Sequence, residues 1–431
     1  MELDLDKLSA VRVLGRGAMG TVFLVIDPSA HPSRPPVFAL KVVEKHSPTA
    51  KPDADRRARW ELSVLSRLAP HPFLPSLLGS LETPDLLAWA VPFCPGGDLN
   101  ALRYSLSDRI FSPAAIRFYL SEIVSALAHL HSLSIVYRDL KPENVLLQAS
   151  GHVTLTDFDL SRHLAPKPLP SPFSSPAFNV PYINPTSLPS PPNNHRRRRN
   201  LTRILFGGHA SSGGGSPDIS VHLQQQLRKA KSARVSPVSR RRPSISGPVA
   251  SAACERSHSF VGTEEYVSPE VVRGDGHEFA VDWWALGILT YEMAYGRTPF
   301  RGRNRKETFR NVLTRQPEFA GRQRTDLIDL ISRLLAKDPT RRLGYAGGAE
   351  EVKAHAFFQG VQWDLLADVN RPPFLPPLED LEEEVLAPFS DETAAAVRCF
   401  DIQTYFKRIR RKQTSPAAPS PFSSSVSLAE F

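Results

Sequence analysis

Four polar side chains stand at close spacing in the stretches IVYRDLKPENVLL and VTLTDFD. The carboxylate of Asp139 can accept a proton or orient a hydroxyl group, and the ammonium group of Lys141 can neutralise a phosphate. Asn144 and Asp157 offer side-chain oxygens of the kind that a hard cation such as Mg²⁺ prefers. These residue types at this spacing predict a catalytic site for phosphate chemistry, with Asn144 and Asp157 as the metal ligands.

A glycine-rich stretch, GRGAMGTV, lies near the N-terminus and is followed by strand-like residues. A dinucleotide-binding glycine motif needs a helix after it, and this sequence predicts a strand instead. A glycine-rich turn between two strands can form a flap over phosphates, because Gly17 and Gly20 allow close backbone approach. An ordinary hairpin turn is the alternative for this stretch alone. The residues assigned to nucleotide binding are Leu14, Gly15, Arg16, Gly17, Ala18, Met19, Gly20, Thr21 and Val22.

Two charged residues of opposite sign follow in apolar surroundings. Lys41 lies in the strand-like stretch VFALK, and Glu61 lies among the apolar residues of the next segment. A lysine in such a strand is ordinarily a surface residue whose charged end reaches water. A charge pair between the strand and the following helix accounts for both residues, and we expect this pair to form.

The elements that must position these side chains follow from the apolar periodicity. Residues 11–45 alternate and are β-branched, which predicts three strands, and 86–94 predicts another. Apolar residues at helical spacing predict a helix over 53–68. From Ser112 the period changes to that of a long amphipathic helix, with Ser112 as its N-cap and Pro113 at its first position. Further helices are expected at 281–294, 325–336 and 349–356.

Composition excludes several classes of protein. The 431 residues allow roughly two or three folding units. Cys94, Cys254 and Cys399 are far apart, which excludes a disulfide framework and a zinc-ligand spacing and fits a reducing compartment. The acidic N-terminus lacks the apolar segment of a secretory signal, and no apolar run is long enough to predict a membrane-spanning helix.

The net charge of +9 is concentrated in one segment. Residues 161–256 contain 15 Lys and Arg against 2 Asp and Glu, whereas the rest of the chain holds 38 basic and 42 acidic residues. Within 162–255, Pro, Ser, Gly and Arg occur without apolar periodicity, so this segment cannot bury enough surface to offset its ordering entropy. We therefore expect it to be disordered.

The motifs in this order resemble those of the eukaryotic protein kinase family over about 11–160 and 256–375. The resemblance also includes Ser-Pro-Glu at 268–270, Asp282 and Arg342. It implies an α+β, bilobal protein kinase fold with a β-rich N-lobe and an α-helical C-lobe, and it implies ATP and Mg²⁺ as cofactors. We expect the N-lobe at 11–93, the C-lobe at 94–160 and 256–375, a disordered basic insertion before the activation segment at 161–255, and an AGC-type tail at 376–431.

The resemblance also implies a role for each site residue. Lys41 would hold the α- and β-phosphates and pair with Glu61, and Asp139 would be the catalytic base. Asn144 and Asp157 would ligate Mg²⁺. In the hinge VPFC, adenine would meet the carbonyl group of Pro92 and the N–H group of Cys94, with Val91 as gatekeeper. An internal apolar column would contain Leu65, Leu77, Tyr137 and Phe158.

Details of the motifs resemble the AGC group, and the DFD triplet followed by a long insertion is similar to the plant AGC VIII kinases. The stretches RRARWE and GHEFAVDWWALG are most similar to the UNICORN and UNICORN-like branch. Asp159 replaces the usual glycine, and Asp is tolerated there if the backbone needs a positive φ. The resemblance implies a plant serine/threonine kinase that acts in signalling and growth regulation. A kinase-shaped scaffold with weak catalysis is the alternative.

Substrate and phosphorylation sites follow from the same resemblance. Acids at the positions of Asp98, Glu143 and Glu292 face the peptide in AGC kinases, and together they favour Arg at minus two or minus three through charge-assisted pairs. Each acid alone is otherwise an ordinary surface charge. Ser259 would be the activation-segment phosphosite. Its phosphate would pair with Arg138, Thr263 would bond Asp139 and Lys141, and Ser244 in RRRPS would be autophosphorylated.

The basic runs at 196–199 and 239–242 leave three interpretations open. They bind an import receptor, they contact anionic lipid at about 1 kcal/mol per basic residue, or they are solvated charge. Sequence-specific nucleic-acid binding is not expected, because no groove-reading element accompanies them. These interpretations predict a cytoplasmic and nuclear location with peripheral plasma-membrane association. Besides protein substrates, an upstream AGC-activating kinase is a candidate partner, but Phe422 and Phe431 are too far apart for its docking motif.

Overall fold

The computed structural model of the chain describes residues 3–17, 19–27, 35–45, 53–164, 263–319, 325–369 and 399–414. All of them belong to one unit, which joins Met1–Ala165 to Ser251–Phe431. Nearly all of the predicted disordered insertion and the first part of the predicted tail lie outside the described residues. Among the described residues, no helix is long and apolar enough to cross a membrane.

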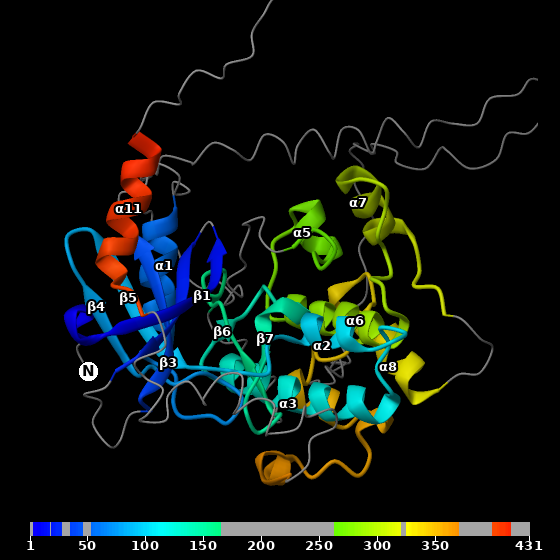
Figure 1. Ribbon diagram of the computed structural model, residues 1–431. Coiled ribbons are helices and arrows are strands. Elements are labelled where there is room, and N and C mark those ends of the chain that lie inside the picture. The colour runs from blue at the N-terminus through cyan, green and yellow to red at the C-terminus, as the bar shows by residue number, and fades with distance from the viewer. Residues whose placement is uncertain are drawn as a thin grey trace, which may run out of the picture. The chain divides into compact units, whose positions relative to one another are not determined.

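Within the described residues, five antiparallel strands form a sheet of order β1-β2-β3-β5-β4 (Figure 1). The strands are β1 (Ser9–Gly17), β2 (Gly20–Ile26), β3 (Val37–Glu44), β4 (Gly79–Glu82) and β5 (Leu86–Pro92). The three strands predicted over 11–45 are confirmed. Gly20 has φ +120, and a Cβ built there would lie 2.5 Å from the carbonyl oxygen of Val42. The turn between β1 and β2 therefore requires glycine at this position.

Helix α1 (Ala54–Leu65) lies between β3 and β4 in the sequence. It falls inside the predicted 53–68 and ends before Leu68. Its buried face includes Ala58, Val64 and Leu65 together with one charged residue, Glu61, which is 3% exposed. A buried glutamate on an otherwise apolar face needs a cation as partner.

A second apolar cluster covers the other face of the sheet. It joins β2 and β3 to the 3₁₀ turn η1 (Leu5–Lys7) and to the C-terminal helix α11 (Ile402–Thr414), which lies beside the strands in Figure 1. Ile402 and Phe406 are buried in it, and Ala10 pairs with Phe400 in an antiparallel bridge. Burying side chains of this size contributes about 1.5–3 kcal/mol each. The described part of the predicted tail, 399–414, therefore packs on the sheet.

The rest of the described chain is mainly helical. Ser112 Oγ accepts the backbone N–H of Ala115 at 3.2 Å and Pro113 is the first helical residue, so the predicted start of α3 is confirmed. Helix α6 is buried along almost its whole length. The helices are α2 (Leu99–Ser105), α3 (Pro113–Ser132), α5 (Pro269–Arg273), α6 (Ala280–Tyr295), α7 (Arg305–Thr314), α8 (Asp326–Leu334) and α9 (Gly348–Lys353). The 3₁₀ turns are η2 (Pro142–Asn144), η3 (Pro339–Arg341), η4 (Ala356–Phe358) and η5 (Trp363–Asp368).

Two short strand pairs hold the loops that carry the predicted catalytic residues. They are β6 (Ile135–Val136) with β9 (Arg162–His163), and β7 (Val145–Leu147) with β8 (Val153–Leu155). The predicted column of Leu65, Leu77, Tyr137 and Phe158 belongs to a single hydrophobic core, which runs from α1 to α6. Because the core includes residues of both loops, among them Tyr137 and Phe158, it fixes the position of the loops.

A buried ion pair also stabilises the helical part. The guanidinium group of Arg342 donates to both carboxylate oxygens of Glu270, at 2.7 and 2.9 Å, and both side chains are almost fully buried. Arg342 also donates to the carbonyl oxygen of Ala280 at the start of α6. The pair lies among structural contacts and connects α5 to α6.

Candidate active site

The loop between β6 and β7 brings Asp139, Lys141 and Asn144 together. Lys141 Nζ lies 2.7 Å from Asp139 Oδ2, and Asn144 Nδ2 donates to the same oxygen at 2.9 Å. Asn144 Nδ2 also donates to the backbone carbonyl of Asp139. Both side chains therefore hold Asp139 through Oδ2, which leaves Oδ1 for another partner.

The same loop is anchored from helix α6 by Asp282, whose side chain is fully buried. Its carboxylate accepts the backbone N–H groups of Tyr137 at 2.8 Å and of Arg138 at 2.7 Å. It also lies 2.8 Å from Nε2 of His131. Arg138 has a left-handed backbone with φ 69, which is unfavourable for a residue with a Cβ. The Asp282 carboxylate therefore holds a strained conformation directly before Asp139.

Lys41 lies between two carboxylates. Its Nζ is 2.6 Å from Oε2 of Glu61 on α1 and 2.9 Å from Oδ1 of Asp157. Burial alone would lower the pKa of Lys41, but the charges of Glu61 and Asp157 outweigh burial and raise that pKa above its ordinary value. The predicted ion pair between Lys41 on the strand and Glu61 on the helix is formed. Lys41 also contacts Asp157, one of the predicted metal ligands.

Asn144 and Asp157 lie on neighbouring turns. The backbone N–H of Thr156 donates to the carbonyl oxygen of Asn144 at 3.0 Å, and strands β7 and β8 pair directly beside them. Burial alone would raise the pKa of Asp157, but the neighbouring charge of Lys41 outweighs it and holds this pKa below its ordinary value. Asp157 is therefore ionised at neutral pH.

These two residues fit a magnesium ion. The amide nitrogen of Asn144 is engaged by Asp139, and Lys41 contacts Oδ1 of Asp157. The other oxygens, Asn144 Oδ1 and Asp157 Oδ2, take no part in these contacts and are of the kind that magnesium prefers. Among the described residues no group of three His, Cys, Asp or Glu side chains could hold a metal. Magnesium is commonly bound by one or two protein oxygens together with substrate phosphates and water.

The glycine-rich turn lies at the β1–β2 hairpin, where Gly17 pairs with Gly20. Val22 on β2 pairs with Lys41 on β3, so the turn and the lysine belong to one sheet register. The strand after the turn excludes a dinucleotide-binding helix, as predicted. Of the remaining residues assigned to nucleotide binding, Leu14, Gly15, Arg16, Met19 and Thr21 lie on this hairpin, and Ala18 lies outside the described residues.

The predicted hinge, VPFC, begins with the last two residues of β5 and continues beyond it. Pro92 is the last residue of β5, and it pairs with Phe38. Burial raises the pKa of the Cys94 thiol to about 11, against a smaller opposing effect of its hydrogen bond with Thr154. This thiol is therefore protonated at neutral pH.

The three predicted substrate-binding acids have different surroundings. Asp98 caps α2 by accepting the N–H of Ala101 at 2.8 Å, and Glu143 is exposed. Glu292 accepts a hydrogen bond from Tyr266 and lies 3.1 Å from Nη2 of Arg103. Burial raises the pKa of Glu292, with a further contribution from the charge of Glu143. The structure thus gives Glu292 a cationic partner, Arg103, that the sequence did not reveal.

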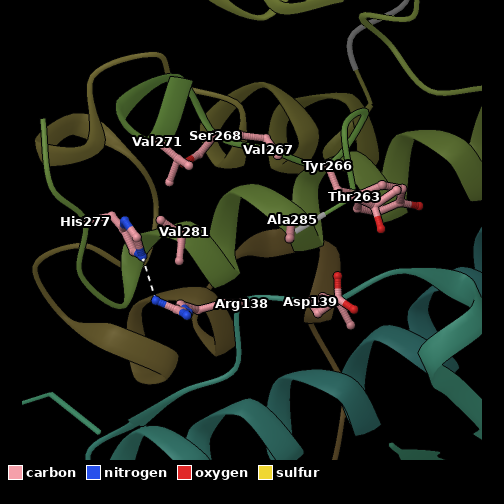
Figure 2. A pocket seen from close by; sticks show the side chains of 11 residues that line it. Arg138, Asp139, Thr263, Tyr266, Val267, Ser268, Val271, His277, Val281 and Ala285 are labelled. Carbon is pink, nitrogen blue, oxygen red and sulfur yellow. Dashed lines mark hydrogen bonds between the residues drawn. The ribbon is translucent and has the colours of Figure 1, made fainter. Parts of the chain in front are cut away.

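Arg138 faces a cavity between the catalytic loop and the segment 263–285, which Figure 2 shows. Its Nη1 lies 3.3 Å from Nε2 of His277, and its Nε donates to the carbonyl oxygen of Leu160 at 2.7 Å. The hydrogen bonds predicted from Thr263 to Asp139 and Lys141 are not formed in the described part of the chain, although Thr263 lines this cavity. Ser244 and Ser259, the predicted phosphosites, lie outside the described residues.

Asp159 does not meet the condition under which the sequence accounted for it, a backbone that needs positive φ. Positive φ occurs at Asp157, with φ 60, and not at Asp159. Instead the side chain of Asp159 is buried and its Oδ2 lies 3.2 Å from Nη1 of Arg57 on α1. Sequence reasoning missed this contact, and only the position of Arg57 one helical turn before Glu61 could have signalled it.

Comparison with known proteins agrees with this geometry. The family described as Protein kinase domain matches residues 8–196 and 248–358. The chain is 50% identical to serine/threonine-protein kinase UCN of Arabidopsis thaliana over 97% of this chain and 93% of that protein. It is also 50% identical to serine/threonine-protein kinase UCNL of the same plant, over 98% and 93%. Serine/threonine-protein kinase OXI1 of Arabidopsis thaliana is 44% identical over 88% and 81%.

Proposed function

The chain belongs to the protein kinase family, and from that membership we infer how its site works. It is a plant serine/threonine protein kinase of the AGC VIII type, similar to its kinase relatives over nearly its whole length. One observation carries the assignment: Lys41 lies 2.6 Å from Glu61 and 2.9 Å from Asp157. The alternative, a kinase-shaped scaffold with weak catalysis, is not favoured, because Lys41, Glu61 and Asp157 are all in contact.

ATP and Mg²⁺, when bound, supply a transferable phosphoryl group whose charge the metal partly neutralises. We propose that Asn144 Oδ1 and Asp157 Oδ2 hold the metal. Lys41 then contacts phosphate oxygens, and Glu61 keeps the Lys41 ammonium group in place. At the hinge, the carbonyl group of Pro92 and the N–H group of Cys94 would bind adenine.

Asp139 is proposed as the base that accepts the proton of the substrate hydroxyl group. Its Oδ2 is held by Lys141 and Asn144, so Oδ1 would be the oxygen that accepts the proton. Burial raises the pKa of Asp139, although Lys141 opposes that shift. A carboxylate with a raised pKa is a stronger base for the proton that is transferred in the transition state. Lys141 would also stabilise negative charge on the transferring group.

The proposed substrates are proteins with Arg at minus two or minus three from the acceptor. The carboxylate of Glu143 supports this preference, since it is exposed and can therefore meet a peptide. Arg103 already pairs with Glu292, so Glu143 and Asp98 would contribute more of the selectivity. Paired peptides with Arg or Ala at these positions test it. Glu143→Gln should reduce the preference, whereas Glu350→Gln, at a side chain 80% exposed on α9, should not.

Two further proposals concern the basic segment. Ser244 and Ser259 would be autophosphorylated, because Ser244 follows the stretch RRRP, which fits the proposed preference for Arg before the acceptor, and Ser259 lies in the predicted activation segment. Phosphosite mapping after incubation with ATP should label both serines, and an unlabelled Ser244 would argue against it. The arginine runs at 196–199 and 239–242 would direct the protein to import receptors or anionic lipid. The full chain is expected in the cytoplasm and nucleus and at the plasma membrane. Deleting 165–250 should change this distribution, whereas kinase activity should survive.

A phosphate-transfer assay tests the proposed function as a whole. The wild type should transfer phosphate from ATP to an arginine-rich peptide, and Asp157→Ala should lose at least about a hundredfold in rate because a metal ligand is removed. The matched control is Asp364→Ala, at an exposed aspartate on η5. Equal incorporation by the wild type and Asp157→Ala would mean that the activity comes from another protein.

A further inference from the structure

The buried pair of Asp159 and Arg57 connects two parts of the active site. The side chain of Asp159 is 4% exposed, and its Oδ2 lies 3.2 Å from Nη1 of Arg57. Arg57 is four residues before Glu61 on α1, so both side chains project from the same face of the helix. The pair therefore joins the turn after Phe158 to the helix that supplies Glu61 to Lys41.

The charges around Asp159 make this contact conditional. The Asp159 side chain is buried two residues after the carboxylate of Asp157, and Arg57 Nη1 lies 3.2 Å from its Oδ2. A buried carboxylate beside a second carboxylate is unfavourable unless a cation compensates it. If α1 moved outward, Arg57 would leave and Asp159 would stay buried beside Asp157. The arrangement therefore favours the position of α1 in which Arg57 reaches Asp159.

A neighbouring hydrogen bond gives the turn a fixed position. Nε1 of Trp60 on α1 donates to Ser161 Oγ at 3.0 Å, and Ser161 Oγ donates to the carbonyl oxygen of Phe158 at 2.6 Å. Phe158 is fully buried, with its ring 5.4 Å from that of Tyr137. Because the turn is anchored in the core, Asp159 has a fixed position, and its contact with Arg57 restricts the position of α1.

We propose that Asp159 is a positioning residue, which acts through Arg57 to hold α1 where Glu61 reaches Lys41. This inference rests on the proposed kinase function. A glycine at this position, which the family resemblance would lead one to expect, has no side chain with which to make the contact. The chain thus holds its α1 through a carboxylate of its own, next to the metal ligand Asp157.

The experiment is a double-mutant cycle with the full-length chain: wild type, Asp159→Asn, Arg57→Gln and the double variant. Each single variant should raise KM for ATP about tenfold and leave KM for the peptide unchanged, because Lys41 contacts the nucleotide and not the peptide. The KM for ATP of the double variant should be no higher than that of the more strongly affected single variant. Hydrogen exchange of Ala54–Leu65 should become faster in all three variants.

Two matched variants separate positioning from general stability. Arg57→Lys keeps the positive charge and should stay closer to wild type than Arg57→Gln in both measurements. Arg56→Gln removes a neighbouring arginine that is 77% exposed and pairs with Asp53 on the surface, so it should change neither measurement. If Asp159→Asn fails to fold, the comparison of Arg57→Lys with Arg57→Gln still decides the question.

The outcomes are distinguishable. Additive losses in the cycle, or unchanged hydrogen exchange of α1, would overturn the inference. Equal changes in the KM for ATP and for the peptide would also overturn it, since they indicate a general loss of structure. If the wild type transfers no phosphate, the proposed function fails, but hydrogen exchange still shows whether Asp159 holds α1.

Discussion

The carboxylate of Asp282, on helix α6, accepts the backbone N–H of Arg138 at 2.7 Å and so fixes the residue directly before Asp139. It also accepts the N–H of Tyr137 at 2.8 Å. Asp282→Ala leaves both donors buried without a partner, at a cost of about 1–3 kcal/mol each. We expect the free energy of unfolding to fall by about 3 kcal/mol and kcat to fall more than tenfold.

Chemical denaturation and steady-state kinetics measure these two effects. The control is Asp275→Ala, because the Asp275 side chain is 55% exposed and pairs with Arg273 on the surface. Exposed pairs of this kind contribute about 0–1 kcal/mol. Unchanged kcat in Asp282→Ala would show that the catalytic loop keeps its conformation without α6.

Lys141 should set the pH dependence of the reaction through Asp139. Lys141 lies 2.7 Å from Asp139 and lowers its pKa, as Asn144 does, whereas burial and the charge of Asp157 raise it. Activity needs ionised Asp139, so the rate falls as the pH decreases through this pKa. Lys141→Ala removes a cation and should raise the pKa further, which moves the acidic limb of kcat/KM to higher pH.

The position of that limb is the measurement, since the height of the profile also reflects the lost phosphate contact. Lys141→Arg keeps the charge and should leave the limb near that of the wild type. A limb that stays in place in Lys141→Ala would mean that the titrating group is not Asp139.

Local patterns in the sequence predicted the elements that carry the site. Ser112 and Pro113 predict the start of α3, because helix capping depends on adjacent residues. The alternation of β-branched residues predicts β1, β2 and β3. Lys41 and Glu61 could be paired in advance because each is a charged residue at an apolar position. The order of the motifs then sufficed to place the catalytic loop next to Asp157.

Contacts between distant parts of the chain could not be predicted in this way. Arg57 and Asp159 are 102 residues apart, and Arg103 and Glu292 meet only because α2 and α6 pack nearby. Asp159 illustrates the same limit. The condition considered for it, a positive φ, concerned the local backbone, whereas a charge on another element accounts for the residue.

The Cys94 thiol should react slowly with alkylating reagents. Burial raises its pKa from 9.0 to about 11, so at a given pH the thiolate fraction falls about a hundredfold. Cys399 is exposed and serves as the control within the same molecule. Mass spectrometry after timed iodoacetamide treatment at pH 8 should show Cys399 modified first. Equal rates at the two residues would contradict the raised pKa of Cys94 at the hinge.

Gly20 and Gly15 provide a matched pair on the glycine-rich hairpin. A Cβ at Gly20 would lie 2.5 Å from the carbonyl oxygen of Val42 with φ +120, whereas a Cβ at Gly15 has nothing within 4 Å. Gly20→Ala should therefore strain β2 against β3 at a cost of about 1–3 kcal/mol. Because Val22 and Lys41 pair in the same register, the strain should also raise KM for ATP. Gly15→Ala should leave the melting temperature near that of the wild type, and equal losses in both variants would show that the hairpin accommodates a side chain at Gly20.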